Sequence, residues 1–129
     1  MTNPLGSRDS TNRATITSRM TAGGVVAIMR HTEATLAIDA AHALLSGGVS
    51  VVEVTLNTAG ALGMIAALAT AMGDTMVVGA GTVLSPQAVD EAVGAGARFI
   101  VAPNTSPAVI DRASHHDVPS VPGAFTPTE

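Results

Sequence analysis

The chain has 129 residues, of which 47% are hydrophobic and 12% are charged, so it has the size of one domain and enough apolar surface for a core. Its formal net charge of −4 argues against nucleic acid or an anionic membrane as a partner. It lacks cysteine, which excludes disulfides and thiolate chemistry, and its apolar runs are shorter than the ~20 residues of a membrane span, which favours a soluble, cytoplasmic protein.

The first 24 residues are predicted to lie outside the main domain. Residues 1–12 are polar, which is typical of a mobile tail. Residues 13–20 form a candidate short helix, because a pair of glycines follows and glycine commonly ends a helix. We therefore assign residues 1–24 to a tail and a leading helix, and residues 25–129 to one domain.

One unit repeats through this domain: a short apolar strand, a turn of small residues, an alanine-rich helix and an exit marked by glycine. We predict strands at residues 25–30, 51–56, 76–83, 98–102 and 119–124. The alternation of strands with helices predicts right-handed βαβ units, a parallel sheet and therefore an α/β fold. Periodicity leaves two architectures open, which are a doubly wound open sheet and part of a (β/α)8 barrel.

The helices of the repeat have start signals in the sequence. They are predicted to begin after Thr32, at residue 59, at Ser85-Pro86 and at Ser106-Pro107. Threonine and serine are good N-caps, and proline suits the first helical turn. In the first of these helices Leu36, Ala40 and Leu44 recur at the spacing of an apolar helix face.

The second predicted strand carries a carboxylate inside an apolar, β-branched run. Residues 51–57 read Val-Val-Glu-Val-Thr-Leu-Asn, a composition typical of a strand buried on both faces. Strand alternation puts Glu53, Thr55 and Asn57 on the same face. Since charges are rarely buried without a reason, Glu53 is the first candidate for chemistry. The alternative is a structural ion pair between Glu53 and Arg30.

Other polar residues gather at the carboxyl ends of the predicted strands, where parallel sheets hold their ligand sites. They are Arg30, His31, Thr55, Asn57, Thr82, Asn104, Thr105, Thr126 and Thr128. The motif Gly79-Ala80-Gly81-Thr82 is a weak phosphate loop, because it matches neither common phosphate-binding pattern. Strand glycines more often permit a close approach, and the Thr82 hydroxyl could then donate to a carboxylate.

The histidines give little sign of a metal site. His31, His42, His115 and His116 have neither the spacing nor the acidic partners of a ligand set. The pair near residue 115 follows a predicted helix, where surface histidines suit the helix dipole. We therefore expect no metal and no other cofactor.

Five ordered motifs, from residue 25 to the last residue, resemble the 2-keto-3-deoxy-6-phosphogluconate (KDPG) and 4-hydroxy-2-oxoglutarate aldolase family. They are Val-Val-Ala-Ile-Met-Arg at 25–30, Val-Glu-Val-Thr-Leu-Asn-Thr at 52–58, Val-Gly-Ala-Gly-Thr-Val-Leu at 78–84, Phe-Ile-Val-Ala-Pro-Asn at 99–104, and Val-Pro-Gly-Ala with Thr-Pro-Thr-Glu at 121–129. The resemblance implies part of a (β/α)8 barrel, usually trimeric. It also implies cleavage of a 2-keto-3-deoxy-6-phospho sugar acid through a lysine Schiff base.

The resemblance carries over to site residues unevenly. Glu53 is similar to the family's general acid/base, and Arg30, Asn57, Thr82, Pro103 and Asn104 match positions that contact substrate. Asn57 departs from the arginine typical of the phosphogluconate enzymes. The Leu-Asn and Pro-Asn pairs resemble the 2-dehydro-3-deoxy-6-phosphogalactonate branch, so the configuration of the sugar acid stays open.

The larger departure is the missing nucleophile. All six basic residues are arginines, so the chain contains no lysine. In the family the Schiff-base lysine lies on a sixth strand, downstream of Thr-Pro-Thr-Glu. Only the N-terminal amine remains to form an imine, and nothing places it near Glu53. We expect an aldolase truncated before its lysine and inactive alone; the alternative is a non-catalytic half-barrel that binds a keto acid or another chain.

Overall fold

The computed structural model describes residues 13–30 and 33–129. Its helices are α1 (Arg13–Gly23), α2 (Ala34–Ser46), α3 (Ala61–Met72), α4 (Pro86–Ala95) and α5 (Pro107–His115), with a short 3-10 turn η1 (Gly73–Thr75). Its strands are β1 (Ala27–Met29), β2 (Val51–Thr55), β3 (Val77–Gly81), β4 (Ile100–Ala102) and β5 (Ser120–Pro122). All five predicted strands therefore form, each somewhat shorter than predicted.

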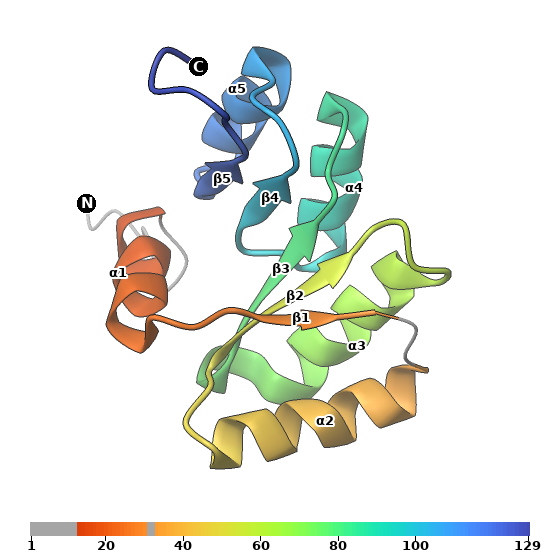
Figure 1. Cartoon of the computed structure of the whole chain (residues 1–129). Helices are drawn as coiled ribbons and strands as arrows, with labels where there is room; N and C mark the ends of the chain where they lie inside the picture. Colours follow the sequence, from red (N-terminus) through yellow and green to blue (C-terminus); the bar gives the residue numbers. More distant parts are fainter. Residues whose placement is uncertain (1–12, 31–32) are drawn as a thin grey trace, which may run out of the picture.

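The strands make one parallel sheet in the order β1-β2-β3-β4-β5 (Figure 1). Helices α2 to α5 pack on one face of it, since their buried side chains share one apolar cluster with alternate residues of the strands. A doubly wound sheet would carry such helices on both faces and reverse its strand order. The sequential order and one-sided cover exclude that alternative and fit consecutive units of a (β/α)8 barrel.

The layer between the sheet and these helices is aliphatic. Val52 and Val54 of β2 are fully buried there, with Ile65 and Leu68 of α3 in the same cluster. Strand alternation sends the intervening residue, Glu53, to the opposite face. We call this opposite face the inner face, and it is the one that carries the candidate chemistry.

Helix α1 covers the amino end of the inner face, across the sheet from α2 and α3 (Figure 1). Ile16 of α1 is fully buried and clusters with Val51, Val77 and Phe99. Val51 and Val77 begin their strands and Phe99 directly precedes β4, so α1 and these side chains close the lower end of the inner face. We call these four residues the floor cluster.

The inner face is exposed along the two edge strands of the sheet. Ile28 of β1, which opposes Glu53 in the register, is 56% exposed, and Val121 of β5 is 46% exposed. Both residues lie on the edge strands of the sheet. Apolar side chains that remain accessible beside unpaired strand edges are typical of a surface that another segment covers.

The start signals of two helices are confirmed. Ser85 caps α4, with its hydroxyl accepting a 3.2 Å hydrogen bond from the Ala88 amide, and Pro86 occupies the first turn. Pro107 likewise opens α5, although Ser106 makes no side-chain cap. The expected cap at Thr32 lies outside the described residues.

The predicted packing face of α2 is wrong by one position. Leu36 is 58% exposed, whereas Ala37 and Ala41 are fully buried, with Ala40 and Leu44 half-buried at the margin. Methyl side chains let α2 approach its neighbours closely, which the bulkier leucine would prevent. Within the described part of the chain, no helix has the length and apolarity needed to cross a membrane.

Candidate active site

Glu53 lies in the middle of β2 with only 6% of its surface exposed. It opposes Ile28 of β1 and Gly79 of β3. Two residues earlier on the same face, Val51 belongs to the floor cluster, so Glu53 is the next inward position above that cluster. The candidate carboxylate therefore sits at the boundary between the packed and the open part of the inner face.

Burial raises the pKa of the Glu53 carboxyl above its usual value, and the positive charge of Arg30 opposes this rise less strongly. In an ordinary structural ion pair the partner's charge dominates and the pKa of the carboxyl falls. For Glu53 the effect of burial is larger than the effect of the Arg30 charge, so the pKa rises instead. Dominance of burial is typical of a carboxyl suited to proton transfer and argues against a purely structural ion pair with Arg30.

Two glycines of β3 make room beside Glu53. A side chain at Gly79 would collide with the Phe99 ring, and one at Gly81 would collide with the Glu53 carboxylate. The glycines thus permit the close approach that strand glycines suggest. The groups that approach them are two side chains of the chain itself.

A tight turn follows β2 and differs from the predicted strand. The Thr58 amide donates to the Thr55 carbonyl, and the two buried threonine hydroxyls lie 3.0 Å apart in a hydrogen bond. Asn57 is exposed in this turn, beyond the end of the strand. The expectation that alternation would align Asn57 with Glu53 and Thr55 is therefore wrong, because the chain turns before residue 57.

Thr82 directly follows β3 and has an unusual backbone conformation. Its φ is 58°, in the left-handed region, which a β-branched residue rarely adopts. The preceding residue, Gly81, is the one against which the Glu53 carboxylate lies. Strained residues of this kind gather at functional sites, so the backbone supports Thr82 as a candidate beside Glu53.

The remaining substrate-binding candidates flank the same edge of the sheet. Arg30 directly follows β1, and Pro103 and Asn104 directly follow β4; all three are exposed. The segment after β4 is held to the segment after β5, because the Thr105 hydroxyl donates to the Gly123 carbonyl over 2.8 Å. In a parallel sheet these strand ends meet at one edge, which agrees with the predicted distribution of polar residues.

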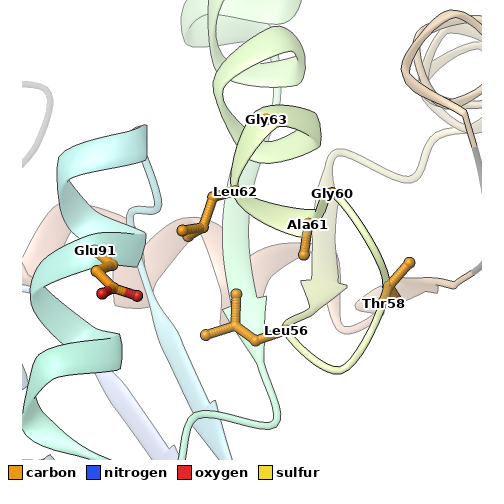
Figure 2. Close-up of a pocket in the computed structure, with 7 residues that line it drawn as sticks. All are labelled: Leu56, Thr58, Gly60, Ala61, Leu62, Gly63 and Glu91. Carbon is orange, nitrogen blue, oxygen red and sulfur yellow. The ribbon is translucent and has the colours of Figure 1, made fainter.

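A hollow of the described residues lies elsewhere, beside α3 and α4 (Figure 2). It holds about 290 Å³ and is lined by Leu56, Thr58, Gly60, Ala61, Leu62, Gly63 and Glu91. Six of these seven are apolar or uncharged, and the seventh is a carboxylate, so the lining offers nothing to attract an anion. Glu53 lies on the inner face of the sheet and does not line this hollow.

The histidine pair has its expected surface placement. His115 and His116 are exposed, as is His42, and His116 Nε2 lies 2.6 Å from the Asp90 carboxylate. Arg112 binds the same carboxylate through two nitrogens, at 2.6 and 2.9 Å. His31 lies outside the described residues. Among residues 13–30 and 33–129, no group of three or more His, Asp or Glu side chains could hold a metal ion.

Sequence reasoning misses one residue of the site, Thr58, and recognises another, Gly81, only as a strand glycine that permits a close approach. Thr58 is buried against Thr55, and Gly81 receives the Glu53 carboxylate. A signal for Gly81 was present, since glycine occupies two alternate positions of one strand and both face the same way. No comparable signal marked Thr58.

Comparison with known proteins gives a consistent family. A family model described as "KDPG and KHG aldolase" matches residues 16–129. The KHG/KDPG aldolase of Escherichia coli (strain K12) is 38% identical over 112 residues, which are 87% of this chain and 52% of the relative. The 2-dehydro-3-deoxy-6-phosphogalactonate aldolase of the same organism is 36% identical over 105 residues, 81% of this chain and 51% of the relative.

A solved structure agrees with these sequences. The KDPG aldolase from Legionella pneumophila, with pyruvate captured as a covalent carbinolamine intermediate, superposes with a TM-score of 0.74 at 31% identity, covering 80% of this chain and 50% of that one. The chain thus spans about half the length of the relatives it matches.

Proposed function

The chain belongs to the KDPG and KHG aldolase family, and we propose that it supplies the acid/base residue of a Schiff-base aldolase. Its five parallel strands and the helices that connect them correspond to part of the (β/α)8 barrel of that family. The proposed reaction is retro-aldol cleavage of a 2-keto-3-deoxy-6-phospho sugar acid to pyruvate and glyceraldehyde 3-phosphate. The observation that carries this proposal is the buried carboxyl of Glu53 on the inner face, with its raised pKa.

In this reaction a lysine amine condenses with the C2 ketone and releases water. Glu53 then takes the proton of the C4 hydroxyl as the C3–C4 bond breaks, which releases the aldehyde and leaves an enamine. The protonated Glu53 returns its proton to C3, and hydrolysis of the imine gives pyruvate and restores the amine. Such a group works best when its pKa lies near the working pH, which burial of Glu53 favours.

The amine must come from outside these 129 residues, since they contain no lysine. Edge strands β1 and β5 and the exposed inner-face residues Ile28 and Val121 offer the surface that a complementing segment would cover. We propose that the chain is inactive without that segment. The binding of the substrate then falls to Arg30, Thr82 and the Pro103-Asn104 pair, all at the carboxyl edge of the sheet.

The configuration of the sugar acid is open between two close relatives. Identity to the phosphogluconate and phosphogalactonate enzymes differs by only two percentage points. Asn57 lies in the exposed turn after β2, where a neutral amide replaces a charged donor and weakens the hold on a carboxylate. We propose Asn57 as the residue of this chain that sets the preference, with the galactonate substrate favoured.

The proposal is tested by complementation. The chain is mixed with the lysine-bearing remainder of the E. coli KHG/KDPG aldolase, and pyruvate release from both sugar acids is measured. Glu53→Gln should lower kcat by about 10²- to 10⁴-fold, the usual contribution of a general acid/base. Glu91→Gln is the matched control, because that carboxylate is exposed on α4. Full activity of Glu53→Gln in the complex would show that the assignment is wrong.

The missing lysine favours the second function, which is a non-catalytic half-barrel that binds a keto acid or another chain. Treatment of the chain with pyruvate and borohydride separates the two chemistries. No internal adduct should form on the chain alone, whereas the complex should gain one adduct on the complementing segment. Binding without turnover in every complex would favour the second function.

We also propose a homo-oligomer, a trimer by resemblance, which sedimentation of the complex would measure.

A further inference from the structure

Glycine at position 81 occupies the point of β3 against which the Glu53 carboxylate rests. We propose that Gly81 is a positioning residue, whose missing side chain lets the Glu53 carboxylate lie against β3 and fixes its position above the floor cluster. This inference rests on the proposed function for the role of Glu53. Its geometry and its principal test are independent of any aldolase activity.

The Glu53 carboxylate occupies the space that a side chain at position 81 would need. A Cβ added at Gly81 would lie 2.3 Å from Oε1 and 2.9 Å from Cδ of Glu53, and 3.3 Å from Cγ2 of Thr55. Non-bonded carbon atoms prefer separations of about 3.5 to 4.0 Å, so any side chain at position 81 excludes the observed position of the carboxylate.

The sheet register explains why Gly81 and not Gly79 receives the carboxylate. Glu53 opposes Gly79, and Thr55 opposes Gly81. Side chains lean along a strand, and the Glu53 side chain crosses to β3 one inward position further on. The place beside Gly79 is already taken by the Phe99 ring, whose Cε1 lies 2.3 Å from the point that a Cβ at Gly79 would occupy. The ring therefore directs the carboxylate toward Gly81.

The two glycines differ in what a methyl group would displace. At Gly79 it would meet the fully buried aromatic ring of Phe99, which is packed in the floor cluster and can move only at the expense of its neighbours. At Gly81 it would meet the end of a flexible side chain, which can rotate away. We therefore expect Gly81→Ala to keep the fold and to move the carboxylate from β3 toward β1, where Ile28 is exposed to water.

The test is a pH titration of the side-chain carboxyls in the chain alone, monitored by carbon-13 NMR of labelled glutamate side chains. The wild type should show one carboxyl, absent in Glu53→Gln, with a pKa above the usual value because it is buried. In Gly81→Ala this pKa should fall toward the usual value, since the displaced carboxyl gains water. Gly94→Ala is the matched control, because a Cβ there meets nothing within 4 Å. An unchanged pKa in Gly81→Ala would overturn the inference.

A double variant keeps the test decisive if Gly81→Ala unfolds. Removal of the carboxylate in Glu53→Ala takes away Oε1 and Cδ, the two nearest atoms that the methyl group would meet, and leaves Thr55 Cγ2 at 3.3 Å. Gly81→Ala should then fold in the Glu53→Ala background, with a melting temperature close to that of Glu53→Ala alone. Failure of the double variant to fold would show that Gly81 serves the backbone and not Glu53.

Activity in the complemented complex separates this inference from the proposed function. Gly81→Ala should lower kcat by at least about 10²-fold with little change in KM, since a displacement of only about 1 Å can already have that effect on a reacting group. A shifted Glu53 pKa together with full activity of Glu53→Gln would leave Gly81 as a positioning residue and refute the catalytic role of Glu53. Lost activity in Gly81→Ala with an unshifted pKa would contradict positioning.

Discussion

The contact between Gly79 and Phe99 offers a direct test of how the inner face is built. Gly79→Ala would place a methyl carbon 2.3 Å from Cε1 of a ring that is fully buried in the floor cluster. Relief to an ordinary contact of about 3.5 Å requires a movement of more than ~1 Å inside a close-packed layer. Overpacking of this kind costs about 1–3 kcal/mol of unfolding free energy, and we expect the upper part of that range.

A smaller side chain at position 99 should compensate for the added methyl group. Phe99→Leu alone should cost about 1–2 kcal/mol, because it leaves less void than the ~3–5 kcal/mol truncation of phenylalanine to alanine. In the double variant the methyl group enters the space that the ring vacates. The two changes together should therefore cost at least ~1 kcal/mol less than the sum of the single costs.

The assay is urea unfolding of the wild type, the two single variants and the double variant. Equal slopes of the unfolding free energy against urea concentration would confirm that all four undergo the same transition. Gly94→Ala serves as the control, because its Cβ meets nothing and alanine in a helix should stabilise α4 by about 0.5–1 kcal/mol. Additivity of the Gly79 and Phe99 changes within about 0.5 kcal/mol would refute the packing argument.

Three further predictions concern charge and strain. Because the pKa of Glu53 is raised in the folded state, ionisation of its carboxyl destabilises the fold. Glu53→Gln should therefore gain stability relative to the wild type as pH rises from about 4.5 through the folded pKa of Glu53. Unfolding free energies of the two proteins at pH 4 and pH 8 test this. Thr82→Gly should relieve the left-handed backbone and raise the unfolding free energy by about 1 kcal/mol over Thr82→Ser; equal stability of the two variants would contradict strain. The hydrogen bonds from Arg112 and His116 lower the pKa of Asp90 to about 2, so the stability that Asp90 contributes is present above pH ~4 and lost as pH falls through 2. Asp90→Asn should therefore melt below the wild type at pH 7, and the two melting temperatures should converge as pH falls below 2.

The order of the elements could be predicted from the sequence because each βα unit carries local signals. Alternation, serine and proline start signals and glycine exits are short-range properties. The five strands, and the helices that follow Ser85 and Ser106, form close to where these signals predict them. Periodicity could not decide between a doubly wound sheet and a barrel. That choice depends on which face the helices cover, and the face is set by contacts between distant units.

The sequence predicts Glu53 as a site residue, but it does not predict which residues pack around its carboxylate. Glu53 is visible as a lone carboxylate in an apolar strand, but its contact with Gly81 depends on the register between β2 and β3. Asn57 was misplaced because the alternation rule continues only while the strand does. The Thr55–Thr58 hydrogen bond that stabilises the turn is a local feature that no hydrophobic pattern reveals.

The inner face changes character over a single step along each strand. Val51 and Val77 pack into the floor cluster, and two residues further on the same strands carry Glu53 and Gly79. The Phe99 ring lies over Gly79, so the floor cluster reaches up to the level of the carboxylate and excludes water from its lower side. Burial raises the pKa of Glu53, and the packing on its lower side contributes to that burial. A segment that closes the open side of the face would remove further water from the carboxyl, so the covering segment and the floor cluster act on its pKa in the same direction.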